Sequence, residues 1–218
     1  MRIHFAEQLE ELNRELITMG ALCEEALGIL ADAMQSGEYG EVKGVFAIEK
    51  SINEIEREIE QLCLKLLLQQ QPVARDLRQI SAALKMITDM ERIGDQTEDI
   101  ADILMSGDQM RPFCNHTIVE MAQASMEMVT TSVDAYVKRS VSLAEDVIKQ
   151  DDIVDGLFLQ ERNTLIAEIA KNPQHGDLVL DQLMIAKYFE RIGDHAVNLA
   201  NWVSFSLTGV HMTDTETE

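Results

Sequence analysis

Apolar side chains recur at steps of three and four residues along most of this 218-residue chain. The first such series runs through Phe5, Leu9, Leu12, Leu16, Met19, Cys23, Ala26, Leu30 and Ala33. This spacing places the series on one side of a helix, and it is typical of long helices packed in a bundle or coiled coil. Strand-type alternation is absent and only three prolines occur, so every long element is expected to be a helix.

Glycine and proline interrupt the pattern and divide the chain into six predicted helices. Two glycines within residues 36–41 end the first helix, and Pro72 ends the second. Gly107 and Pro112 mark a boundary between two halves of the chain. The predicted helices span about residues 5–33, 45–66, 74–104, 114–149, 151–170 and 177–206.

Both halves show the same order of helices, so the predicted fold class is all-α, a tandem duplication of a three-helix bundle. The predicted bundles cover residues 1–106 and 110–208. Residues 209–218 form an acidic tail that is expected to be disordered. The repeat is far longer than one unit of a solenoid, which excludes that class of fold.

The charge balance limits the partners that the chain can have. It carries 39 acidic and 18 basic residues, a net charge of −21, so its surface repels nucleic acids and anionic lipid heads. Three cysteines, Cys23, Cys63 and Cys114, are far apart and suit a reducing compartment. The acidic N-terminus does not resemble a signal peptide, and no apolar run approaches the roughly 20 residues that span a bilayer. A cytoplasmic protein without nucleic-acid partners is expected.

One pentapeptide, Glu-Arg-Ile-Gly-Asp, occurs twice, at residues 91–95 and 190–194. Each copy continues the apolar seam of a predicted helix. Acidic or amide side chains recur at four-residue steps in and after each copy, and this spacing is expected to stack them on one helix face. The preceding helix of each half carries a similar pair. The candidate ligands are therefore Glu49, Asn53, Glu91, Asp95 and Asp99 in the first half and Asp151, Asp155, Glu190, Asp194 and Asn198 in the second.

Carboxylates stacked on an apolar seam repel one another, so a cation is expected to neutralise them. Oxygen ligands suit divalent or trivalent metal ions such as Mg, Ca, Mn or iron, with Zn as a further candidate, and carboxylates can bridge two metals. Gly94 and Gly193 each cost about 1 kcal/mol relative to alanine inside a helix, which indicates close approach of a neighbouring helix or an uncluttered metal site. Arg92 and Arg191 offer an alternative, because these arginines could pair with the acids, which would then bind no metal.

The sequence carries none of the common active-site motifs. It has no Glu-x-x-His pair of a ferritin-like di-iron bundle, no His/Cys group with zinc spacing, no glycine-rich phosphate loop and no nucleophile elbow. His195 follows Asp194 on a different side of the helix and is not expected to be a ligand. A non-enzymatic protein is expected. Two alternatives stay open: a structural helical dimerisation module without metal, and the less favoured metal-dependent phosphohydrolase.

Two stretches resemble the PhoU family, the accessory and regulatory proteins of bacterial phosphate transport. They are LLLQQQPVARDLRQISAALKMITDMERIGDQTEDIA at residues 66–101 and YFERIGDHAVNLANWV at residues 188–203. The resemblance extends over residues 1–209 and implies a tandem pair of three-helix bundles. In some members of this family, acidic motifs bind multinuclear metal clusters.

The resemblance also assigns roles to individual residues. By motif, Glu91, Asp95 and Asp99 would serve one metal cluster, and Glu190 and Asp194 the other. Asn198 stands where the first half has Asp99 and would be a weaker ligand. The family often has aspartate in place of Glu49, while Asn53, Asp151 and Asp155 fill the expected places on the other helices.

The function that the resemblance implies is regulatory. Such a protein would restrain the phosphate-starvation response and phosphate uptake by linking the Pst phosphate ABC transporter, through its ATPase subunit, to the sensor histidine kinase. A homodimer or higher oligomer is expected, with the membrane reached only through protein partners.

Overall fold

The computed structural model describes residues 2–69, 72–106, 115–210 and 212, and six long helices account for most of them. Their bounds are α1 Arg2–Ser36, α2 Val45–Gln69, α3 Ala74–Ser106, α4 His116–Lys138, α5 Val141–Lys171 and α6 Gly176–Thr208. Two short 3-10 helices, Val42–Gly44 and Pro173–His175, precede α2 and α6. The prediction of an all-α chain with two sets of three helices is confirmed, and no strand occurs in the residues so described.

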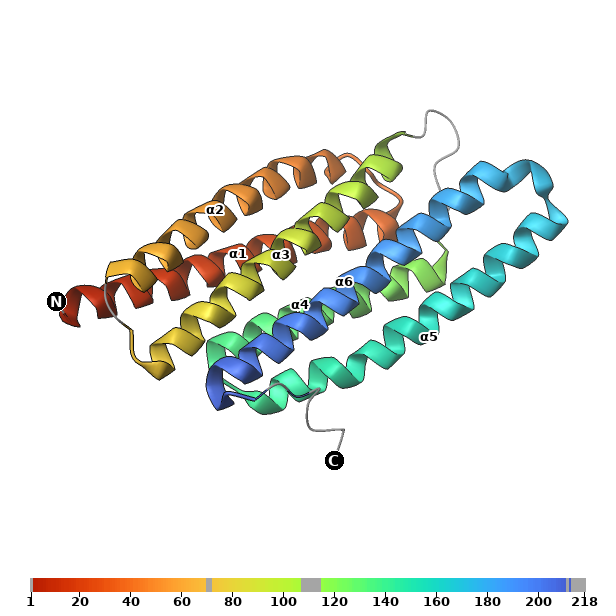
Figure 1. Ribbon diagram of the computed structural model, residues 1–218. Coiled ribbons are helices and arrows are strands. Elements are labelled where there is room, and N and C mark those ends of the chain that lie inside the picture. Colours follow the sequence, from red (N-terminus) through yellow and green to blue (C-terminus); the bar gives the residue numbers. More distant parts are fainter. Residues whose placement is uncertain (1, 70–71, 107–114, 211, 213–218) are drawn as a thin grey trace.

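Equivalent helices of the two halves pack against each other at the centre of the molecule. Helix α3 packs along α6, and α1 packs along α4. Helix α2 covers α1 and α3 on one flank, while α5 covers α4 and α6 on the other (Figure 1). The central helices therefore bury apolar side chains on more than one face, whereas α2 and α5 each have one face in water.

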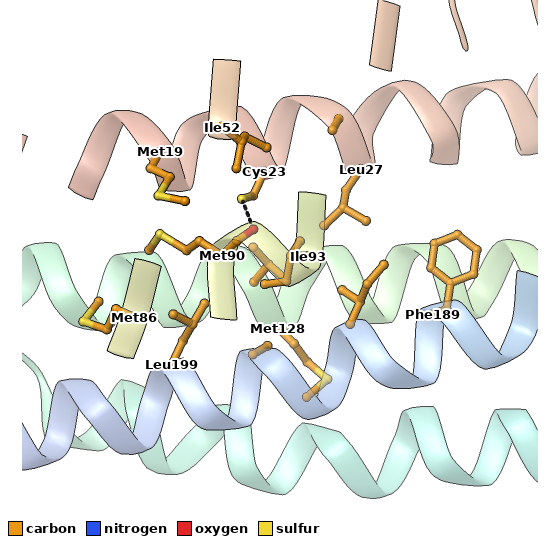
Figure 2. Close-up of a cluster of buried hydrophobic side chains, with 14 of the residues drawn as sticks. Met19, Cys23, Leu27, Ile52, Met86, Met90, Ile93, Met128, Phe189 and Leu199 are labelled. Atoms are coloured by element: carbon orange, nitrogen blue, oxygen red, sulfur yellow. Dashed lines mark hydrogen bonds between the residues drawn. The ribbon is translucent and has the colours of Figure 1, made fainter. Parts of the chain in front are cut away.

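One hydrophobic core runs through both halves. Figure 2 shows part of it, with Met19 and Cys23 of α1 beside Met90 of α3, and Phe189 of α6 further along the bundle. The Cys23 thiol donates to the carbonyl oxygen of Met90 at 3.5 Å, and burial raises its pKa to about 12. The prediction that Cys23 is a core residue is confirmed. Because the core is continuous, apolar burial stabilises the contact between the halves as well as each half.

The predicted boundary between the fourth and fifth helices was wrong. Helix α4 ends at Lys138, about ten residues before the expected position, and α5 begins at Val141. Arg139 makes the break by adopting the left-handed conformation, with φ 51° and ψ 47°. The Ser140 hydroxyl then accepts a hydrogen bond from the Leu143 backbone N–H at 3.3 Å and caps α5. No glycine or proline marks this turn, so the apolar pattern continues through it.

Close helix approach explains a glycine in α1. A Cβ atom added at Gly20 would lie 2.8 Å from Cγ2 of Val133 in α4, nearer than side-chain atoms pack. Gly28, two turns further along α1, would meet nothing within 4 Å. Glycine at position 20 is therefore required by the contact between the two halves, and glycine at position 28 is not.

Two sequence predictions fall on residues outside those described. The first is the boundary at Gly107 and Pro112. The second is the disordered tail, of which only residues 209, 210 and 212 are described. The break at Pro72 lies between α2 and α3, as predicted. None of the helices in the described ranges combines the length and the apolar character that crossing a membrane requires.

Candidate metal centre

The two pentapeptide copies lie in the middle of α3 and α6, and in each copy the isoleucine is buried and the glycine lies beside the flanking helix. Ile93 and Ile192 are fully buried in the core. An added Cβ at Gly94 would lie 3.2 Å from Cδ1 of Ile52 in α2. At Gly193 it would lie 3.4 Å from Oδ1 of Asp151 in α5. Both glycines therefore allow the flanking helix to approach, as the sequence indicated.

Carboxylates from α2 and α3 gather beside Gly94. Burial and then the charge of Asp95 raise the pKa of Glu49. Burial raises the pKa of Glu91 as well, followed by the charges of Asp95, Glu56 and Glu49, although Arg92 opposes them. Burial of Glu98, and then the charge of Glu49, raise the pKa of Glu98. The acids of the two facing helices thus act on one another, as a group with excess negative charge does.

Two contacts partly satisfy this first group. Asn53 donates its side-chain amide to Oε1 of Glu49. The Arg92 guanidinium lies 3.4 Å from Glu91 and 3.0 Å from Asp95. Because the Arg92 side chain is 52% exposed, water screens both ion pairs and they contribute little. The excess of carboxylates over cationic groups remains.

The second group lies between α5 and α6. Burial raises the pKa of Asp151 to about 6, followed by the charges of Asp155, Asp194, Asp152 and Glu190. Burial and Glu190 also raise the pKa of Asp194. The geometry brings the predicted residues Asp151, Asp155, Glu190 and Asp194 into one electrostatic unit. Four carboxylates from two facing helices therefore share this site.

A lysine, which the sequence reasoning did not single out, pairs with this second group. Lys187 donates to Oε2 of Glu190, and its ammonium lies 5.4 Å from the centroid of the Phe158 ring. Arg191, the expected partner, has no ion pair among the described residues. The alternative in which arginines pair with the acids is therefore seen at Arg92, whereas in the second half Lys187, one turn before Arg191, forms the ion pair.

The last member of each predicted series lies elsewhere. Asn198 donates to Oδ1 of Asp89 in α3 at 3.1 Å, and Asp99 is hydrogen-bonded to Tyr188 in α6. The prediction that each series stacks on one face was therefore wrong for Asp99 and Asn198. Eight residues at about 100° each leave a side chain roughly 80° away from the first one.

Two residues were missed as members of the site. Glu98 takes the place expected of Asp99, because a residue seven positions after Glu91 lies within about 20° of Glu91 around the helix axis. Glu56 in α2 stands one heptad after Glu49 and joins the first group. A seven-residue spacing, read in place of the four-residue one, would have identified both.

The donor set fits a hard cation in charge and chemistry. It consists of carboxylate oxygens whose mutual repulsion a cation would relieve, as Mg, Mn and iron sites require. In the conformation described, however, no three His, Cys, Asp or Glu side chains of the described ranges converge closely enough to hold one ion. Binding would therefore require rotation of carboxylate side chains, which their partly exposed positions allow.

Comparison with known proteins gives an independent finding. The family model described as "PhoU domain" matches residues 16–104 and 118–203, one match in each half. A "Phosphate-specific transport system accessory protein PhoU homolog" of Clostridium acetobutylicum is 32% identical over 212 residues, covering 94% of both chains. A protein of the same description from Synechocystis is 32% identical over 209 residues, covering 95% of this chain and 93% of its own.

Solved structures show the same fold. The crystal structure of PhoU from Pseudomonas aeruginosa aligns with a TM-score of 0.87 and 29% identity, covering 94% of this chain and all of that one. A phosphate transport system regulatory protein PhoU from Streptococcus pneumoniae aligns with a TM-score of 0.83 over 95% of this chain and 99% of its own, at 22% identity. The second likeness is evidence for the fold alone.

Proposed function

Because the chain belongs to the PhoU family, we propose that it is an accessory protein of a phosphate-specific transport system that restrains phosphate uptake and the phosphate-starvation response. The observation that carries this proposal is the match of the family model to both halves, with relatives similar over nearly their whole length. A helical scaffold with exposed faces on both flanks suits a protein that acts by contact. In this proposal it is not an enzyme and works in the cytoplasm.

The proposed partners are the ATPase subunit of the phosphate transporter and the sensor histidine kinase of the phosphate response. Two halves with equivalent flanking helices, α2 and α5, support simultaneous contact with two proteins. A homodimer or higher oligomer is also part of the proposal. Deletion of the gene in its source bacterium should leave phosphate-repressed genes active in phosphate-rich medium, and the wild-type gene should restore repression. Normal repression in the deletion strain would refute the regulatory role.

The metal-binding part of the proposal rests on the two carboxylate groups. Glu49, Glu91, Asp95 and Glu98 would hold cations in the first half, and Asp151, Asp155, Glu190 and Asp194 in the second. Bound cations would supply positive charge and join the flanking helix to the central one. The residues themselves provide the oxygen donors, while Gly94 and Gly193 allow the approach of the facing helices.

A metal-free structural module remains the second candidate, and one observation favours it. Arg92 pairs with Glu91 and Asp95, and Lys187 pairs with Glu190, so part of the negative charge is neutralised by the chain itself. The two candidates differ in their response to chelators. If metals bind, removal with EDTA should lower the melting temperature and added Mn²⁺ should restore it. An unchanged melting temperature would favour the metal-free module.

A further inference from the structure

A cavity of about 160 Å³ lies away from both carboxylate groups, where helices from the two halves meet. Figure 1 shows the start of α3 and the ends of α4 and α6 at the same end of the bundle, and α1 passes beside them. The polar side chains that matter in the cavity are Asn13, Arg75, Gln79, Tyr136 and Arg139. They come from α1, α3, α4 and the turn after α4, so only the folded chain brings them together.

The hydrogen bonds among the lining side chains determine which of their donor groups stay available. Gln79 donates to Oδ1 of Asn13 at 3.0 Å, and the Tyr136 hydroxyl donates to the same oxygen. Both lone pairs of that oxygen are thereby used, so the Asn13 side chain presents its two amide N–H groups. Gln79 keeps a second N–H. The Ser206 hydroxyl also lines the cavity, but it donates to the Val203 carbonyl oxygen at 2.7 Å and offers no donor.

The cavity has cationic side chains and no carboxylate among its described lining residues. Arg75 and Arg139 both line it, in a chain with 39 acidic and 18 basic residues. Neither guanidinium forms an ion pair with any residue that the structure describes. Ile17 and Leu207 form apolar walls beside the two arginines, which are themselves exposed to solvent. Two unpaired guanidinium groups beside amide donors form a site for an anion.

The backbone at Arg139 gives a second, independent reason to assign a use to this side chain. The residue adopts φ 51° and ψ 47°, the left-handed conformation in which a helix ordinarily ends with glycine or asparagine. Arginine is disfavoured there because its Cβ crowds the backbone. Strain of this kind clusters at functional sites, so the conformation agrees with a role for the Arg139 side chain.

We propose that this cavity binds a small tetrahedral oxyanion, such as phosphate or sulfate, between Arg75 and Arg139, with the Asn13 and Gln79 amides as further donors. The planar guanidinium fork matches two oxygens of such an ion. Overall charge disfavours anions around this protein, so binding is confined to a place where cations and donors converge. The inference rests on the cavity alone and is independent of the metal ions and of the regulatory role.

A competing explanation defines the test. Helices α4 and α6 end at this cavity, and their terminal carbonyl groups carry partial negative charge. Arginines placed here only to neutralise those ends would stabilise the protein without binding an anion.

The experiment is calorimetric titration of the full chain, treated with EDTA and dialysed into chloride buffer of low ionic strength, with inorganic phosphate and separately with sulfate. We expect one ion per chain, and an affinity at least about tenfold weaker in Arg75→Ala/Arg139→Gly. Arg139→Gly relieves the strained backbone, so this variant should fold at least as well as the parent. If the double variant does not fold, the single variant Arg75→Ala should still bind the anion more weakly than the parent.

The matched control is Arg57→Ala/Arg162→Ala, which removes the same charge from exposed positions on α2 and α5. It should bind phosphate as the parent does, apart from a small general effect of charge. Absence of binding in the parent, or equal binding in all three proteins, would overturn the proposal. Tighter binding of a phosphate monoester, lost in the same cavity variant, would support the site and identify the anion as part of a larger molecule.

Discussion

Asn198 of α6 donates its side-chain amide to Oδ1 of Asp89 in α3 at 3.1 Å, across the interface between the two halves. His195 Nδ1 lies 3.0 Å from the same oxygen. In the reverse direction, Tyr188 of α6 is hydrogen-bonded to Asp99 of α3. The residues after each pentapeptide therefore join the halves, while the glutamate, glycine and aspartate within it lie beside the flanking helix.

The first prediction concerns the Asp89 carboxylate. Asp89→Ala removes the acceptor of Asn198 and the partner of His195, so we expect a loss of about 1–2 kcal/mol in the free energy of unfolding, measured with urea. Metal content should be unchanged because Asp89 lies outside both carboxylate groups.

Thr88→Ala is the matched control, since that exposed hydroxyl only donates to the Leu84 carbonyl oxygen of its own helix. It should change stability by less than about 0.5 kcal/mol. Equal effects of the two substitutions would contradict the role given to Asp89.

The second prediction separates two glycines of α1. Gly20→Ala places a Cβ atom 2.8 Å from Val133, so we expect it to lower the free energy of unfolding by about 1–3 kcal/mol. Gly28→Ala meets nothing within 4 Å and should raise it by up to about 1 kcal/mol through helix propensity. Urea unfolding of both variants measures the difference. Adding Val133→Ala should recover part of the loss at Gly20, and similar effects at both glycines would refute the close approach of α1 to α4.

The third prediction is a dependence of stability on pH that comes from Glu161. This side chain is fully buried, its two oxygens accept from Asn115 at 2.9 and 2.8 Å, and burial raises its pKa. The folded protein therefore holds the Glu161 proton to higher pH than the unfolded chain does. Its contribution to stability is complete below the unfolded pKa of about 4.3 and is lost as pH rises through the folded value.

Glu161→Gln removes this titration while keeping an oxygen for Asn115. The variant should gain stability relative to the parent as pH rises above the unfolded pKa of about 4.3, until Glu161 is ionised in both states. Glu145→Gln, at an exposed position of the same helix, serves as the comparison. A difference between Glu161→Gln and the parent that does not grow with pH would show that Glu161 does not titrate in this range.

The fourth prediction tests the two carboxylate groups as metal sites. Elemental analysis of protein purified without chelator should find metal in the parent and about half as much in Glu91→Gln/Asp95→Asn or in Asp151→Asn/Asp194→Asn. Each double variant removes ligands from one half only.

Asp99→Asn is the informative control for that experiment. Since Asp99 is hydrogen-bonded to Tyr188 and is not a proposed ligand, the variant should keep its metal. Loss of metal in Asp99→Asn would restore the ligand role first expected from the sequence, and a metal-free parent would favour the structural module.

Much of the site was predictable because it depends on local spacing. The helical seam, the two pentapeptides and the approach of a neighbour at Gly94 and Gly193 all follow from residue types and short periods. The position of Glu98 was also present in the sequence, but a four-residue step drifts around the helix whereas a seven-residue step nearly closes.

Other features depended on contacts that no local pattern contains. The turn at Arg139 has no glycine or proline, so only the packing of α4 and α5 against the core requires the chain to reverse there. Lys187 and Arg191 both lie within one turn of Glu190 in the sequence, and the rotation of α6 decides that Lys187 pairs with it.

The sequence by itself therefore determined that the chain forms long helices in two similar sets, and which side chains each helix turns to a common side. Only the tertiary structure decided which side meets which neighbour, placing Asp89 against Asn198 and collecting Asn13, Arg75 and Arg139 around one cavity. The physical reason is that a helix of period 3.6 fixes its own faces through local hydrogen bonds. Its rotation within a bundle is set by the summed burial of apolar side chains from the whole chain.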